Sequence, residues 1–121
     1  MDTAESHTDS AQYVSVLLHS TAAATLIRVS GELDLGSVHH LEDCLNRALA
    51  NGDGQPIHVD LGNVSFIDCV GFEPLTRAAA GLQDGRVLTI TSASPRVRRL
   101  MELLGDVDVH MDASVDIASG A

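Results

Sequence analysis

Two aspartates and a cysteine are the residues of this chain whose types and spacing best suit chemistry. Asp34 and Asp68 each follow an apolar stretch, and Cys69 comes directly after Asp68. Paired carboxylates serve general acid–base catalysis, but catalysis also needs a nucleophile and oxyanion donors arranged around them, and no motif in the sequence indicates such an arrangement. We therefore expect no enzyme. The simpler prediction for Asp68 is that it caps the start of a helix.

Cys69 is a candidate redox sensor. A thiol at a helix N-terminus is stabilised as the thiolate by the helix dipole, although an acidic neighbour such as Asp68 opposes this. The alternative is a small, half-buried residue with no redox role. Cys44 lies on the apolar stripe of a predicted helix and is expected to be buried, which disfavours a disulfide between the two cysteines.

The sequence predicts neither a metal site nor a cofactor. His40 and Cys44 are four residues apart, a spacing that metal ligands use on a helix, but no CxxC or HxxxH motif supplies further ligands. Gly31, Gly62 and Gly71 form neither a dinucleotide-binding motif nor a phosphate-binding loop.

The net charge of the chain disfavours some classes of partner. The 121 residues include 7 basic ones, all arginine, and 17 acidic ones, for a net charge of -10. Such a chain repels nucleic acid and anionic membranes. It has neither a signal-peptide pattern nor an apolar run of about 20 residues, so we expect a cytoplasmic protein. Its one basic cluster, Arg96, Arg98 and Arg99, is either a surface for an acidic partner or the solvated face of a helix.

The pattern of apolar residues predicts one α/β domain. We expect a disordered polar tail over residues 1–11, the domain over 12–112, and a weakly ordered C-terminal tail over 113–121. Alternating apolar residues predict strands over 13–19, 25–30, 56–61, 86–91 and 107–110. Apolar spacings of three and four predict helices after Ser37, between 71 and 83, and after Ser94. Together they predict a small mixed sheet of about five strands, with an antiparallel N-terminal hairpin and a largely parallel remainder, covered by three to four helices.

The segment from Pro56 to Leu75, PIHVDLGNVSFIDCVGFEPL, resembles a known family. An aliphatic strand ends in Asp-Leu, and Val-x-Phe-Ile-Asp leads into a helix. This is similar to the STAS domains, and specifically to the free-standing bacterial anti-sigma factor antagonists. LIRVSGELD over residues 26–34 resembles their second strand, and SPRVRRLMELLG over 94–105 resembles their third helix. The similarity runs from about Tyr13 to Met111.

The resemblance implies a protein that switches partners. In the family, a serine or threonine before the motif glycine receives a phosphate; the unphosphorylated antagonist binds an anti-sigma factor, a serine kinase of the GHKL type, and the phosphorylated one releases it. It thereby regulates transcription that depends on a sigma factor. The binding surface implied here consists of Asp34, Phe66, Asp68, Cys69, Val70, Gly71 and Phe72. The alternative is a soluble regulatory subunit of an ABC-type membrane transport complex, because STAS domains also accompany such systems.

The chain departs from the family pattern at two places. Val70 occupies the acceptor position and has no hydroxyl, and Cys69 replaces the preceding serine. We therefore predict binding that phosphorylation does not switch at this position, while phosphorylation of Ser65 or another hydroxyl stays open. Pro74 lacks the N–H that would bond the Val70 carbonyl, so the helix either begins later or has a loosened first turn. The sequence does not indicate the oligomeric state.

Overall fold

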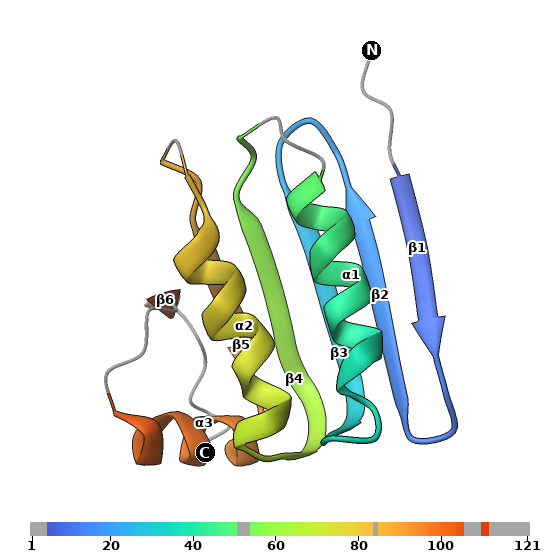
Figure 1. Cartoon of the computed structure of the whole chain (residues 1–121), viewed down its shortest axis with the longest axis vertical. Coiled ribbons are helices and arrows are strands. Elements are labelled where there is room, and N and C mark those ends of the chain that lie inside the picture. The colour runs from blue at the N-terminus through green and yellow to red at the C-terminus, as the bar shows by residue number, and fades with distance from the viewer. Residues whose placement is uncertain (1–4, 51–53, 84, 106–109, 112–121) are drawn as a thin grey trace.

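The computed structural model describes residues 5–50, 54–83, 85–105 and 110–111, which form a sheet with helices beside it (Figure 1). The strands are β1 (Glu5–Ser10), β2 (Val14–Ser20), β3 (Thr25–Leu33), β4 (Ile57–Ile67), β5 (Leu88–Ala93) and β6 (His110–Met111). The helices are α1 (Val38–Ala50), α2 (Cys69–Gly81) and α3 (Pro95–Leu104). The predicted α/β class is confirmed.

The strands lie in the sheet in the order of the chain, from β1 to β6. β1, β2 and β3 pair antiparallel, whereas β3, β4, β5 and β6 pair parallel. The predicted antiparallel start and parallel remainder are therefore confirmed. Figure 1 shows α1 and α2 side by side on one face of the sheet, with α3 across its lower end.

The N-terminal segment differs from the prediction. Residues 5–10, expected to belong to a disordered tail, form β1, which pairs with β2 from Glu5 opposite Ser20 to Ser10 opposite Ser15. The described part of the sheet therefore has six strands rather than about five. An edge strand is held by backbone hydrogen bonds on one side only and does not need an apolar pattern, so a search for alternating apolar residues misses it.

The C-terminal predictions are only partly covered. Of the strand expected over residues 107–110, the structure describes His110, which lies with Met111 in β6 beside β5. The tail expected over residues 113–121 lies outside the described residues.

The core lies between the sheet and the helices. Alternate residues of β2 to β5 point into it, and each fully buried Leu or Ile contributes about 1.5–3 kcal/mol to folding. The helices contribute Leu41, Cys44, Leu45 and Ala48 from α1, Phe72, Leu75 and Ala78 from α2, and Val97 from α3. Because β3 and β4 are parallel, their carboxyl ends lie at the same end of the sheet, and the loops that lead to α1 and α2 meet there.

Candidate functional site

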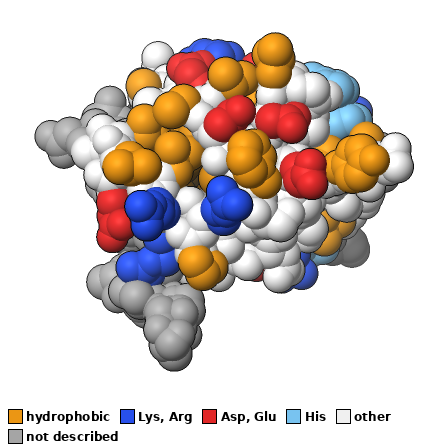
Figure 2. All heavy atoms as spheres, turned by 90° about the horizontal axis from the view of Figure 1, so that it is seen from below, with side chains coloured by type: hydrophobic (Ala, Val, Ile, Leu, Met, Phe, Trp, Pro, Cys, Tyr) orange, Lys and Arg blue, Asp and Glu red, His pale blue; other side chains and the backbone are white. Residues whose placement is uncertain are grey.

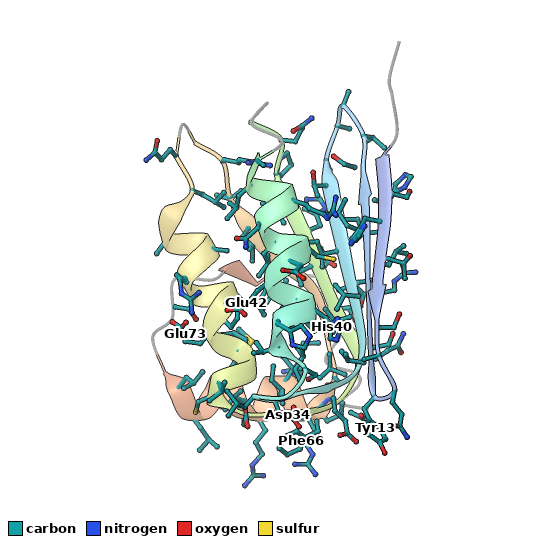
Figure 3. All side chains as sticks on the ribbon, turned by 45° about the vertical axis from the view of Figure 1, so that its right-hand side comes forward. Tyr13, Asp34, His40, Glu42, Phe66 and Glu73 are labelled. Carbon is teal, nitrogen blue, oxygen red and sulfur yellow. The ribbon has the colours of Figure 1, made fainter. Side chains whose placement is uncertain are left out.

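The loops at the carboxyl ends of β3 and β4, together with the turn between β1 and β2, form one end of the molecule, which Figure 2 shows from below. We call it the end face and define it by Tyr13, Asp34, Leu35, Phe66, Asp68, Cys69 and Val70. Figure 3 shows Tyr13, Asp34 and Phe66 at this end, whereas Glu42 and Glu73 lie higher up, on the helices.

The loop after β3 is held by its own hydrogen bonds. The Asp34 carboxylate accepts from the backbone N–H of Gly36 at 3.0 Å, and the Asp34 carbonyl accepts from the N–H of Val38 at 2.8 Å. The Ser37 hydroxyl donates to the carbonyl of Glu32 at 2.6 Å and accepts from the N–H of Asp34 at 3.1 Å. The loop is therefore ordered by hydrogen bonds within the chain itself.

Asp68 caps α2, as the sequence predicts. Its backbone is extended, with φ -123° and ψ -175°, and its carboxylate accepts from the N–H of Gly71 at 2.8 Å. Its carbonyl accepts from the N–H of Phe72 at 3.0 Å. Asp34 and Asp68 thus both use a carboxylate oxygen to order the backbone, a structural role that needs no catalysis.

Gly71 lets the start of α2 lie directly against the end of β3. A Cβ at this position would lie 2.3 Å from the carbonyl oxygen of Leu33 and 2.8 Å from its carbonyl carbon. Real side chains do not approach a backbone so closely, so only glycine fits. This close approach places the tip of α2 beside the loop that carries Asp34.

Two of the predicted surface residues are not on the surface. Phe72 is 1% exposed and belongs to the core, and Gly71 is buried against β3. The helical repeat explains this correction, since positions 71, 72 and 75 of α2 turn toward the sheet while Cys69 and Val70 turn toward solvent. Asp68 and Phe66 are half-buried.

Apolar side chains gather on the end face. Three of the six large hydrophobic residues exposed in the described part of the chain lie here: Tyr13 at 60%, Leu35 at 76% and Val70 at 43%. Sequence reasoning included Val70 but missed Tyr13 and Leu35. Leu35 carried a signal, because it is an apolar residue between Asp34 and Gly36 in a turn, where nothing buries it.

Phe66 joins the end face to α3. The guanidinium carbon of Arg96 lies 5.6 Å from the centroid of the Phe66 ring, within the range of a cation–π interaction. In Figure 2, arginine side chains adjoin the apolar and acidic ones on this end of the molecule.

Pro74 does not delay the helix. α2 begins at Cys69 and continues through Pro74, so of the two alternatives given for Pro74 the later start is wrong. Pro74 is buried beside a groove of about 280 Å³ between α1 and α2, lined also by Leu45, Leu49 and Ala78. Arg77 crosses between these helices, with ion pairs to Glu42 at 3.5 Å and to Glu73. The hydrogen bond to Glu73 raises the pKa of Arg77 above its ordinary value.

The two cysteines have opposite surroundings. Cys69 is exposed at the first residue of α2, whereas Cys44 is buried, with its sulfur 4.0 Å from the carbonyl oxygen of Val16. Neither forms a disulfide. Across the described residues, no group of three or more histidine, cysteine or acidic side chains is placed to hold a metal ion. Nor is any helix there long and apolar enough to cross a membrane.

Comparisons with known proteins agree with this architecture. An anti-sigma-B factor antagonist of Staphylococcus aureus (strain NCTC 8325 / PS 47) is 32% identical over 93 residues, which cover 75% of this chain and 85% of that protein. One from Staphylococcus epidermidis is 31% identical over 93 residues, with the same shares covered.

Two solved structures share the fold. The crystal structure of an anti-sigma factor antagonist from Mycobacterium paratuberculosis matches with a TM-score of 0.75 at 24% identity, covering 87% of this chain and 90% of that one. The structure of the anti-sigma factor antagonist SpoIIAA in its unphosphorylated form matches with a TM-score of 0.62 at 23% identity, covering 94% of this chain and 92% of that one.

A family model gives the assignment. The model described as "Mlab, STAS domain" matches residues 16–108, which include most of β2, all of β3 to β5 and all three helices that the structure describes. With the sheet order, the capped α2 and the relatives above, this match means that the chain belongs to the STAS domain family.

Proposed function

We propose that this chain is an anti-sigma factor antagonist that binds an anti-sigma factor of the GHKL serine-kinase type through the end face. Binding would withdraw the anti-sigma factor from its sigma factor and so permit transcription. The names of the Staphylococcus relatives support the general role. The kinase type comes from the resemblance of the segment around Asp68 and Gly71 to the free-standing antagonists.

The observation that carries the proposal is the exposure of Val70 at the tip of α2. Its side chain is 43% exposed and stands with Leu35 and Tyr13 on a face whose loops are already ordered. Apolar side chains on preorganised loops gain free energy when a partner covers them, and lose little entropy. Asp34 supplies a charged group at the rim, where charge governs the choice of partner.

Binding at this face is not switched by phosphorylation of position 70, because valine carries no hydroxyl. Phosphorylation of a relative's serine would place about -1.5 to -2 charges at the helix tip, and a partner that covers this tip would have to desolvate them. Ser65 is the one hydroxyl between residues 65 and 71, and it is exposed on β4.

The first test is to identify the partner. The tagged chain is incubated with lysate of its source organism, and the proteins retained are identified by mass spectrometry. A GHKL-type kinase that then binds in purified form supports the proposal. A transport ATPase or permease in its place would support the alternative, a regulatory subunit of a transport complex.

The second test uses two valines of almost equal exposure. Val70 is 43% exposed on the end face, and Val87 is 41% exposed just before β5, at the opposite end of the sheet. Val70→Asp should weaken binding to the purified kinase about tenfold or more, because the interface must desolvate the new charge. Val87→Asp should leave the affinity unchanged within about twofold. Equal losses from both variants would contradict binding at the end face.

The third test concerns the missing acceptor. The purified kinase and ATP should leave the mass of the wild-type segment 65–71 unchanged, whereas Val70→Ser should gain about 80 Da there. A phosphorylated wild-type segment would place the modification on Ser65 and contradict the prediction that this segment is not switched.

A further inference from the structure

One side of α3 carries exposed residues at helical spacing next to the end face. Arg96, Arg99 and Leu103 are three and four residues apart, so they lie on one stripe of the helix. Both arginines are exposed, and Leu103 is 76% exposed. Arg96 lies over the ring of Phe66, which places the stripe beside the end face. We call these three residues the α3 stripe.

The stripe is held by a rigid helix. Ser94 caps α3, its hydroxyl accepting from the N–H of Val97 at 3.4 Å, and Pro95 occupies the first turn. Val97 is fully buried and anchors the opposite side of the helix in the core. The position of the α3 stripe relative to Val70 and Asp34 is therefore set before any partner arrives.

The charges of the stripe contrast with those of other arginines in the chain. Arg28 pairs with Asp60 at 3.1 Å, Arg77 pairs with two glutamates, and Arg86 donates to the carbonyls of Gln55 and Ala48 at 2.6 and 2.9 Å. Arg96 instead lies over the ring of Phe66 and is exposed to solvent. Arg99 stands one turn further on. In a chain of net charge -10, this stripe presents a local patch of positive charge.

We propose that the α3 stripe is a second recognition area, which receives an acidic segment of the anti-sigma factor that also carries an apolar residue. This inference rests on the proposed function. A guanidinium held over the Phe66 ring is restricted in its motion and can bind a carboxylate through two hydrogen bonds. Leu103, one to two turns beyond, offers an apolar contact to the same segment. Asp34, half-buried on the same end face, attracts a basic group of the partner, so the two charges of opposite sign favour one orientation of the partner.

The test compares reversal of charge on the stripe with the same reversal elsewhere. Arg96→Glu/Arg99→Glu is compared with Arg47→Glu, because Arg47 is exposed in the last turn of α1 and that helix runs away from the end face for its 13 residues (Figure 1). The probe is the purified kinase that the wild-type chain binds, and the dissociation constant is measured by titration calorimetry. Thermal melts establish that each variant is folded.

The double reversal should weaken binding about tenfold or more, Arg96→Gln/Arg99→Gln should weaken it less, and Arg47→Glu should change it less than about twofold. Leu103→Ser should weaken it by about threefold. If the double reversal misfolds, the glutamine pair carries the same test, because it removes the attraction without adding charge.

The outcomes separate this inference from the proposed function. If Val70→Asp loses binding while the double reversal binds as well as the wild type or more tightly, the α3 stripe has no role in binding the anti-sigma factor. The proposed function would still stand. A loss of binding free energy in Arg47→Glu that is half as large as in the double reversal, or larger, would also overturn the role of the α3 stripe, since net charge alone would then decide. A wild-type chain that binds no anti-sigma factor overturns both.

Discussion

The two ends of the sheet differ in their charged and exposed apolar side chains. At the opposite end, Arg86 is half-buried and donates to the carbonyls of Gln55 and Ala48, so that its charge holds the chain together. At the end face, the carboxylates of Asp34 and Asp68 order two loops, and those loops present Leu35 and Val70 to solvent. Both ends use charge to fix the backbone, but the end face also carries a cluster of apolar side chains.

The two ends also show that one exposed apolar residue is not enough to indicate a binding site. Val70 and Val87 are almost equally exposed, at 43% and 41%. Val70 shares the end face with two other exposed apolar residues, Tyr13 and Leu35, whereas Val87 lies at the opposite end of the sheet. A partner gains free energy in proportion to the contiguous apolar area that it covers, so the cluster matters more than its single members.

The largest expected effect comes from the close approach that builds the end face. Gly71→Ala should lower the free energy of unfolding by about 2–3 kcal/mol, because the new Cβ would overlap the carbonyl of Leu33. Gly81 ends the same helix with no atom within 4 Å of a new Cβ, and Gly81→Ala should raise the free energy by about 0.5 kcal/mol. Urea denaturation measures both. Equal effects at the two glycines would mean that α2 does not lie this close to β3.

The next effect concerns the opposite end. Arg86→Ala should lower the free energy of unfolding by about 2 kcal/mol, since the carbonyls of Gln55 and Ala48 lose a charged donor. Arg47→Ala, an equal truncation at an exposed site of α1, should cost less than about 0.5 kcal/mol. Affinity for the anti-sigma factor should stay the same in both variants. A weaker affinity in Arg86→Ala would mean that the opposite end of the sheet also contributes to binding.

A smaller effect distinguishes the two roles of Asp68. Asp68→Ala should cost about 1 kcal/mol of stability because the N–H of Gly71 loses its acceptor, whereas Asp68→Asn should cost little because asparagine caps equally well. Chemical denaturation gives these values. If both variants fold but only the asparagine variant retains wild-type affinity, Asp68 acts in binding through capping; if both lose affinity equally, its charge contacts the partner.

The last prediction uses chemical modification of Cys69 to detect binding at the end face without any substitution. In the native protein, one thiol per chain should react quickly with a thiol-specific reagent, because Cys69 is exposed and Cys44 is buried. Unfolding should release the second. Bound anti-sigma factor should slow the modification of Cys69, and unchanged kinetics in the complex would place the partner elsewhere.

The elements close to the site were the easier part of the prediction. The periodic segments over α1, α2, β3 and β4 carried strong signals, and the residues around Asp68 predicted both the cap and the start of the helix. Phe72 lies two residues beyond Val70, and the resemblance predicts both on the binding surface. Two residues along a helix are a rotation of about 200°, which turns the side chain from solvent to core.

Some features had no local signal. β1 is polar and sits at the edge of the sheet, so its pairing with β2 depends on backbone bonds that composition does not reveal. Tyr13, Leu35 and Arg96 stand far from Val70 in the chain, and no spacing rule links them. The contact of Arg96 with Phe66 joins residues 30 positions apart, from helix and strand.

The sequence by itself determined the class of the fold, the cap at Asp68 and the absence of a hydroxyl at position 70, because each follows from local periodicity or from the chemistry of a single side chain. Only the tertiary structure decided which residues share the end face. The parallel pairing of β3 and β4 and the glycine contact at Gly71 bring the loops together. Such contacts join distant parts of the chain, and their free energy depends on the packing of the whole domain.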